Sequence, residues 1–200
     1  MSETPAEAQQ WRLGYYQARP IQSTKRYRVM IAGRRFGKTR SAIVRMLLKA
    51  VNKPGSWIWY VAPTYRMAQE ITWEPLKGLV PRAYLKGKPN ESLLTLRFRN
   101  GSTIALKGSD NPDSLRGPGL DLVLLDEFAD IKPITWTEVL FAALSDKQGE
   151  ADFYGTPKGF NWGYDLFQQG QDPLNFPDWQ SWQFTTLHGG RVTPDEVRLA

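Results

Sequence analysis

The chain has 200 residues, of which 41% are hydrophobic and 12% aromatic, and a formal net charge of +6. This length and apolar content suit a folded α/β domain rather than a disordered chain, and the basic excess is compatible with a polyanionic partner. The absence of cysteine excludes disulfides and thiolate metal sites. The single histidine, His188, argues against a histidine metal cluster or a Ser-His-Asp triad. Neither a membrane span nor a signal peptide is recognisable in the sequence.

The first predicted elements are a buried strand over 28–33 and a helix over 38–51. Between them stands AGRRFGKT, which departs from the phosphate-loop pattern G-x-x-x-x-G-K-[ST] by holding Ala32 at the first glycine position. A strand that runs through such a loop into a helix presents backbone N–H groups to an anion. Lys38 would reach the outer phosphates and the Thr39 hydroxyl would bind Mg²⁺. The expected nucleotide-binding residues of the loop are Ala32, Gly33, Arg34, Arg35, Phe36, Gly37, Lys38 and Thr39. The alternative is a strand-loop-helix turn that happens to contain Gly-Lys-Thr.

The next elements are a strand over 57–63 and a helix over 64–80 that opens at an N-cap threonine. Two alternating runs over 92–108, around Asn100-Gly101, predict a β-hairpin. Residues 109–119 are a loop by composition, because glycine, proline, aspartate and serine dominate them.

A fully apolar run over 120–127 predicts a buried strand that ends in Asp126 and Glu127. Ligands of open α/β sheets bind at the carboxyl ends of the strands, where these acids would lie. Asp126 is the candidate Mg²⁺ ligand, and Glu127 is the candidate general base for an attacking water. The alternative is a pair of solvated acids at the end of a strand.

A helix is predicted over 133–146, strands over 151–157 and 182–187, and irregular structure over 159–177. The strand over 151–157 ends in Gly155, Thr156 and Pro157, which would place Thr156 near the γ-phosphate. The alternative, which these residues favour when taken alone, is an ordinary Gly-Thr-Pro turn. Apolar strands that alternate with helices predict an α/β fold with a mainly parallel sheet, flanked by helices on both faces, and a loop-rich C-terminal extension.

Taken together, several stretches resemble the ATPase domain of the terminase large subunit of tailed bacteriophages, the DNA-packaging motor. They are YYQARPIQ, RVMIAGRRFGKT, WIWYVAPTYRMAQEITWEPL, LRFRNGSTIALKGSDNPDSLRGPGLDLVLLDEFADI and FYGTPKG, and they cover roughly residues 14 to 160. The resemblance implies an ASCE-type P-loop fold, ATP and Mg²⁺ as cofactors, and ATP-driven translocation of double-stranded DNA into a procapsid.

The resemblance also implies roles for single residues. Gln22 matches the glutamine that recognises adenine, with Gln17 as a possible substitute. Arg34 matches the loop arginine that contacts the γ-phosphate or couples hydrolysis, and we expect its neighbour Arg35 to turn away. Arg116 matches an arginine finger offered to the ATP of a neighbouring subunit. The coupling motif corresponds to Gly155, Thr156 and Pro157.

The expected organisation is an N-terminal segment over 1–20, a P-loop ATPase core over 21–160 and an extension over 161–200, without the nuclease domain of full-length relatives. By resemblance, the partners are the portal protein, the small terminase subunit and further copies of the chain in a ring, although the isolated chain is compatible with a monomer. The place of action is the host cytoplasm, at the procapsid portal, with no membrane involved.

DNA binding by this domain should be weak and independent of sequence, because a motor holds the phosphate backbone rather than the bases. Lys25, Arg26 and Arg28 are candidates for such contacts, against the alternative of a solvated charged segment. Two other functions remain open: an ATPase similar to superfamily 2 helicases, which would need a second domain, and a nucleotide-dependent interaction module without hydrolysis, against which Glu127 argues.

Overall fold

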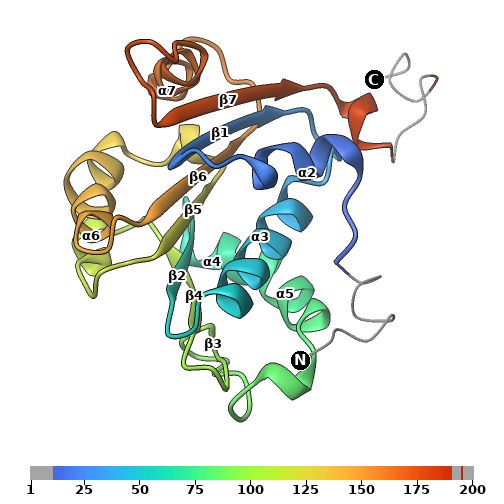
Figure 1. Cartoon of the computed structure of the whole chain (residues 1–200), viewed down its shortest axis with the longest axis vertical. Helices are drawn as coiled ribbons and strands as arrows, with labels where there is room; N and C mark the ends of the chain where they lie inside the picture. Colours follow the sequence, from blue (N-terminus) through green and yellow to red (C-terminus); the bar gives the residue numbers. More distant parts are fainter. Residues whose placement is uncertain (1–10, 191–194, 196–200) are drawn as a thin grey trace.

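The computed structural model describes residues 11–190 and residue 195. Residues 1–10 of the expected N-terminal segment, and 191–194 and 196–200 of the expected extension, lie outside the described residues. The strands form one seven-stranded sheet in the order β3-β4-β2-β5-β6-β1-β7, in which only the β3/β4 pair is antiparallel (Figure 1). The strands are β1 (Tyr27–Ala32), β2 (Trp57–Ala62), β3 (Thr95–Arg97), β4 (Thr103–Gly108), β5 (Leu122–Asp126), β6 (Glu150–Gly155) and β7 (Trp179–Phe184).

Helices cover both faces of this sheet, as the α/β pattern predicts. The α-helices are α2 (Tyr15–Gln22), α3 (Lys38–Asn52), α4 (Tyr65–Met67), α5 (Glu74–Leu79), α6 (Phe141–Ser145) and α7 (Trp162–Gln171). Two π-helical segments, η1 (Ala68–Trp73) and η5 (Thr135–Leu140), continue into α5 and α6, and the short 3-10 helices are η2 (Arg82–Tyr84), η3 (Pro112–Leu115), η4 (Phe128–Asp130) and η6 (Thr186–Gly189). None of the helices in the described part of the chain has the length and apolar character that a membrane span requires.

The hydrophobic core consists of two clusters, one on each face of the sheet. The first packs α3 and α5 against the strands and includes Met46 and Leu76. The second packs η5, α6 and α7 against the other face and includes Leu140 and Leu166. The predicted fold class is therefore confirmed.

The irregular structure predicted over 159–177 is wrong for residues 162–171, which form α7, whereas the strand predicted over 182–187 is present as β7 over residues 179–184 and pairs in parallel with β1. Asn161 caps α7 by accepting bonds from the backbone N–H groups of Gly163 and Tyr164. The helix then packs on β7, where the backbone of Ser181 leaves no room for a side chain at Gly170. The extension thus completes the sheet of the core.

The strand order brings three separate segments to one edge of the sheet. Strand β6 lies between β1 and β5 and is parallel to both. At their carboxyl ends, β1 leads into Gly33, β5 into Glu127 and β6 into Thr156. Residues that lie far apart in the chain are therefore neighbours at this edge.

A buried charge network holds α3 to β1 and β6. Arg28 on β1 and Arg45 on α3 both donate to Asp152 and Glu150 on β6, and Lys49 adds a further ion pair to Glu150. These pairs hold the pKa of Glu150 down to about 2, even though its burial works in the opposite direction. Since the Arg28 side chain is only 3% exposed, its prediction as a DNA contact is wrong.

Lys25 and Arg26, the other two candidates for DNA contacts, both donate hydrogen bonds to backbone carbonyls of the protein. The guanidinium of Arg26 donates to the carbonyl of Gly149 at 2.8 Å, and the ammonium of Lys25 donates to the carbonyl of Pro177 at 2.7 Å. Both contacts fasten the segment before β1 to neighbouring loops.

Candidate active site

The loop between β1 and α3 keeps the shape of a phosphate loop despite its alanine. Ala32 is the last residue of β1 and is fully buried, so its extended backbone needs no glycine. The glycine at position 33 is explained by packing, because an added Cβ would lie 2.3 Å from the hydroxyl oxygen of Thr186. Left-handed backbone angles then occur at Arg35 (φ 61°) and Gly37 (φ 99°) and turn the chain into α3.

The loop and the first turn of α3 present unpaired donors. In the described part of the chain, no acceptor is found for the backbone N–H groups of Arg34, Arg35, Gly37, Lys38 and Thr39. Groups of this kind at a helix N-terminus form a site for an anion. The arrangement therefore fits a chain of phosphates.

Helix α2 contacts this loop through the side chain of Gln17. Its buried side-chain amide donates to the carbonyl of Phe36 at 2.7 Å and accepts from the backbone N–H of Gly14 at 3.0 Å. An added Cβ at Gly37 would lie 2.4 Å from the same amide nitrogen. The Ser41 hydroxyl, on α3, donates to the backbone carbonyl of Gln17 at 3.0 Å. Gln17 thus fixes the loop and the start of α3 together.

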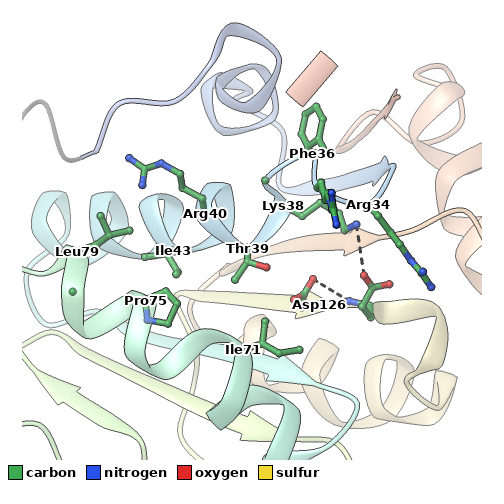
Figure 2. Close-up of a pocket in the computed structure, with 14 residues that line it drawn as sticks. Arg34, Phe36, Lys38, Thr39, Arg40, Ile43, Ile71, Pro75, Leu79 and Asp126 are labelled. Atoms are coloured by element: carbon green, nitrogen blue, oxygen red, sulfur yellow. Dashed lines mark hydrogen bonds and ion pairs between the residues drawn. The ribbon is translucent and has the colours of Figure 1, made fainter. Parts of the chain in front are cut away.

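Lys38, the first residue of α3, converges with Glu127 and Thr156, which follow β5 and β6. The Lys38 ammonium lies 3.3 Å from the Thr156 hydroxyl and 3.1 Å from the carbonyl of Ala32. It also lies 3.6 Å from the Glu127 carboxylate, an ion pair drawn as a dashed line from Lys38 in Figure 2. The Thr156 hydroxyl lies 2.8 Å from each carboxylate oxygen of Glu127, to which its backbone N–H also donates at 3.3 Å. Glu127 has a left-handed backbone (φ 44°), which is uncommon for a residue other than glycine. This conformation turns it toward β6.

Asp126 is buried beside this group. Its carboxylate accepts from the Tyr60 hydroxyl and, at 3.1 Å, from the backbone N–H of Glu127. Burial raises the pKa of Asp126, and the neighbouring charge of Glu127 raises it further. The pKa of Tyr60 is raised well above its usual range by burial and by Asp126, so its hydroxyl remains a donor.

The Asp126 carboxylate and the Thr39 hydroxyl face the same space in Figure 2. A carboxylate and a hydroxyl beside a phosphate site are the donor set that Mg²⁺ uses, with phosphate oxygens and water completing its shell. The residues present therefore fit this ion.

These groups line one end of a pocket of about 840 Å³. Its other end is apolar, between α3 on one side and η1 and α5 on the other, as Figure 2 shows for Ile43, Ile71, Pro75 and Leu79. The pocket thus combines a polar end for phosphates with an apolar end, a common form of ligand site. The lining residues are Arg34, Arg35, Phe36, Gly37, Lys38, Thr39, Arg40, Ile43, Ile71, Pro75, Gly78, Leu79, Asp126 and Glu127.

Arg34 and Arg35 are exposed in the pocket lining, and no hydrogen bond or ion pair holds either guanidinium within the described residues. Gly155 lies against Phe128, where an added Cβ would come within 2.8 Å of the ring. Pro157 lies in an adjacent smaller pocket that Thr156 also lines.

Of the predicted residues, Ala32, Gly33, Gly155, Thr156 and Pro157 flank the residues of this pocket without lining it, whereas Gln22 and Arg116 are not brought to it. Gln22 is exposed at the end of α2 and does not line it. Arg116 is exposed in the loop after η3, where its guanidinium pairs with Asp113 at 3.0 Å. A role for Arg116 at a nucleotide would therefore require a second subunit.

Sequence reasoning missed Tyr60 and Thr186, and it assigned Gln17 only as a substitute for Gln22. A signal for Tyr60 was present, because a tyrosine inside an otherwise apolar strand must find a partner for its hydroxyl. Thr186 had no such signal, since its contact with Gly33 depends on where β7 ends.

Comparison with known proteins places this geometry in a family. The family model described as terminase large subunit, T4likevirus-type, N-terminal, matches residues 29–187. The chain is 33% identical over 166 residues to the terminase large subunit of Thermus virus P23-45, which covers 74% of this chain and 34% of that protein. It is 29% identical over 178 residues to the terminase large subunit of Escherichia phage T5, covering 88% and 40%. The chain thus spans between a third and two fifths of the length of these curated relatives.

Solved structures agree with this match. The large terminase ATPase domain of Thermus phage P74-26 superposes with a TM-score of 0.78 at 28% identity, covering 92% of this chain and 86% of that one. The large terminase of another thermophilic bacteriophage, in complex with ADP, gives a TM-score of 0.75 at 16% identity, covering 94% and 49%, a likeness that concerns the fold.

Proposed function

The chain belongs to the terminase large subunit family, of which it carries the T4likevirus-type N-terminal domain, and on this premise we propose that it hydrolyses ATP to drive double-stranded viral DNA into a procapsid. The observation that carries the proposal is the convergence of Lys38, Glu127 and Thr156 at the mouth of the phosphate loop. A site that only bound nucleotide would need the loop and its lysine, but not a carboxylate held beside them.

In the proposed reaction the phosphates of ATP lie on the free N–H groups of the loop, and Lys38 exchanges its present acceptors for phosphate oxygens. Thr39 and Asp126 are the residues that would hold Mg²⁺, and the ion would neutralise charge on the phosphates. Glu127 accepts a proton from the water whose oxygen bonds to the γ-phosphorus, while Thr156 keeps the carboxylate aimed at that water. The bond between the γ-phosphorus and the β,γ-bridging oxygen breaks in the same step, and ADP and phosphate are released. Arg34, whose guanidinium is free within the described residues, is available for the γ-phosphate.

Beyond the domain itself, the proposal places several copies of the chain in a ring at the portal of the procapsid, in the host cytoplasm, together with the small terminase subunit. The named ATPase activity of the P74-26 domain supports this function. The exposed position of Arg116 supports the ring, because an arginine offered to a neighbour must lie on the surface.

The experiment is ATP turnover by the purified chain, alone and with portal, small subunit and DNA, with Glu127→Gln as the control. Release of phosphate that disappears in the variant supports the proposal. Tight nucleotide binding without phosphate release, even in the complete assembly, would make the domain a nucleotide-dependent interaction module instead.

A further inference from the structure

A basic groove lies at the β3 edge of the sheet. Figure 1 shows this edge at the opposite end of the sheet from β1, which leads into the phosphate loop. Alternation along the strands directs one set of side chains to this face, while Leu96, Ile104 and Tyr60 point to the core on the other side. The side chains of this face are Trp57 and Trp59 on β2, Thr95 and Arg97 on β3, and Thr103, Ala105 and Lys107 on β4.

Two loops border this face where a parallel sheet would ordinarily carry a helix. One contains Lys86 and Lys88, and the other contains Arg116 and Gly117, which packs close to the ring of Trp59. Together they enclose a groove of about 800 Å³. Trp59 and Ala105 of this face are buried, and its exposed or half-buried side chains are those of Trp57, Thr95, Arg97, Thr103 and Lys107. Accessible side chains that are mostly polar or cationic suit a ligand rather than a missing helix.

The charge of the groove has one sign. Its lining contains five cations, Lys86, Lys88, Arg97, Lys107 and Arg116, and no aspartate or glutamate. Of these five, only Arg116 forms an ion pair with a described residue, at the groove's rim.

The acids that lie near the groove are committed elsewhere. Glu91 accepts from Trp73 and Lys77, and Asp121 pairs with Lys53 and Lys147. The Lys107 ammonium lies 5.4 Å from the centre of the Trp59 ring, which orients one of the cations. Four of the groove's cations, Lys86, Lys88, Arg97 and Lys107, therefore have no acidic partner among the described residues.

We propose that this groove binds the phosphodiester backbone of double-stranded DNA; the inference rests on the proposed function, because it identifies the surface by which the motor would hold its DNA. The cations come from four separate segments of the chain, as an extended polyanion requires, rather than from one enclosing loop, as a mononucleotide requires. Single strands are held mainly by stacking of bases on exposed rings, whereas here Trp59 and Phe98 are buried and only Trp57 is exposed.

The test compares two double variants of the full chain that change the net charge equally. Lys86→Glu with Lys88→Glu alters the groove, and Arg19→Glu with Lys132→Glu alters exposed cations outside both pockets. Binding of a labelled duplex of mixed sequence is measured by fluorescence anisotropy across a salt series. We expect the groove variant to lose about tenfold or more in affinity, and its salt dependence to flatten by about one unit of slope per lysine that contacts a phosphate. The control variant should lose less than about threefold.

Equal weakening by both variants, or none by either, would overturn the proposal, as would preference for a single strand of the same length. Binding of polyglutamate as tightly as the duplex would also overturn it, by pointing to an acidic protein partner. Binding of a fluorescent ATP analogue is measured on the same samples. If the unmodified chain does not bind the analogue, the proposed function is contradicted. If the groove variant binds both the analogue and the duplex as the unmodified chain does, only the groove proposal is contradicted.

Discussion

The hydroxyl of Thr156 lies 2.8 Å from both carboxylate oxygens of Glu127. The contact joins the segment after β6 to the acid that follows β5, and Lys38 lies within 3.6 Å of the same carboxylate. The conformation of the proposed general base is therefore set by the strand next to its own. A change in Thr156 would reach the chemistry without altering the phosphate loop.

Thr156→Val keeps the size of the side chain and removes its hydroxyl. We expect turnover to fall by about tenfold, the equivalent of one hydrogen bond of about 1.4 kcal/mol, because Glu127 loses the contact that orients it. Nucleotide affinity should change by less than about threefold, since the loop N–H groups are untouched. Thr156→Ser restores the hydroxyl and should restore turnover. Single-turnover phosphate release and anisotropy of a fluorescent ATP analogue measure the two quantities, and a loss of affinity that matches the loss of rate would contradict this role.

Glu127→Gln removes the proposed base and keeps the shape of the side chain. Turnover should fall by about 10²–10⁴, the usual contribution of general base catalysis. Binding of ATP should persist, so the variant should remain loaded with uncleaved nucleotide. Chromatography of the bound nucleotide distinguishes ATP from ADP, and recovery of ADP at the unmodified rate would exclude Glu127 as the base.

Gln17→Ala and Gln22→Ala form a matched pair on one helix. Gln17 satisfies the buried carbonyl of Phe36, so its loss should destabilise the fold by about 1–3 kcal/mol and weaken nucleotide binding. Gln22 is exposed and outside the pocket lining, and the resemblance alone assigns it to adenine. Urea denaturation and nucleotide titration check both variants. A selective loss of preference for ATP over GTP in the Gln22 variant would restore the adenine role to that residue.

Arg116→Ala tests the finger proposed for the neighbouring subunit. The isolated variant should bind ATP as the unmodified chain does, because its own pocket does not include this residue. Turnover by the complete assembly should fall by about 10³–10⁵ if the residue completes a site in a second subunit. Mixed assemblies of Arg116→Ala and Glu127→Gln chains provide a further check, because a neighbour-supplied arginine allows partial recovery where an intact pair meets.

The stability of the fold should depend on pH through Glu150. Its folded pKa of about 2 lies below the ordinary value of 4.5, so the stabilisation is complete above about pH 5 and is lost as the pH falls toward 2. The contribution is on the order of 2 kcal/mol, since a side chain that is 25% exposed is partly screened by water. Urea denaturation between pH 3 and pH 7 should show this decline in the unmodified chain and in the exposed-acid control Glu138→Gln, but a flatter curve in Glu150→Gln. The same loss of stability at low pH in all three proteins would contradict this role of Glu150.

The parallel sheet and the main site could be predicted from the sequence because both depend on patterns of neighbouring residues in the chain. Apolar strands lead directly into Gly33, Glu127 and Thr156, and the rule that ligands bind at carboxyl strand ends then brings these residues together. The loop's alanine did not hide the site, because the strand before it and the helix after it supply the context.

What the sequence could not predict depends on contacts between distant segments. Gln17 and Gln22 lie on one helix, and only the packing of α2 decides which of them meets the loop. Arg28 belongs to a basic run, yet it is buried because Asp152 and Glu150 on another strand accept its hydrogen bonds. Helix α7 was missed because its glycines and glutamines suggest a loop, whereas Asn161 starts the helix and β7 supports it.

The contacts of Thr186 with Gly33 and of Gln17 with Gly37 bracket the phosphate loop at both ends. A loop fixed in this way has few conformations to lose when nucleotide arrives, so most of the ordering entropy has been lost already during folding. Association should therefore proceed in a single kinetic step, and calorimetry should give nearly the same binding entropy for ADP as for ADP with a γ-phosphate mimic. Removal of either contact would leave the loop less ordered before binding, so nucleotide affinity would fall by the free energy needed to order it.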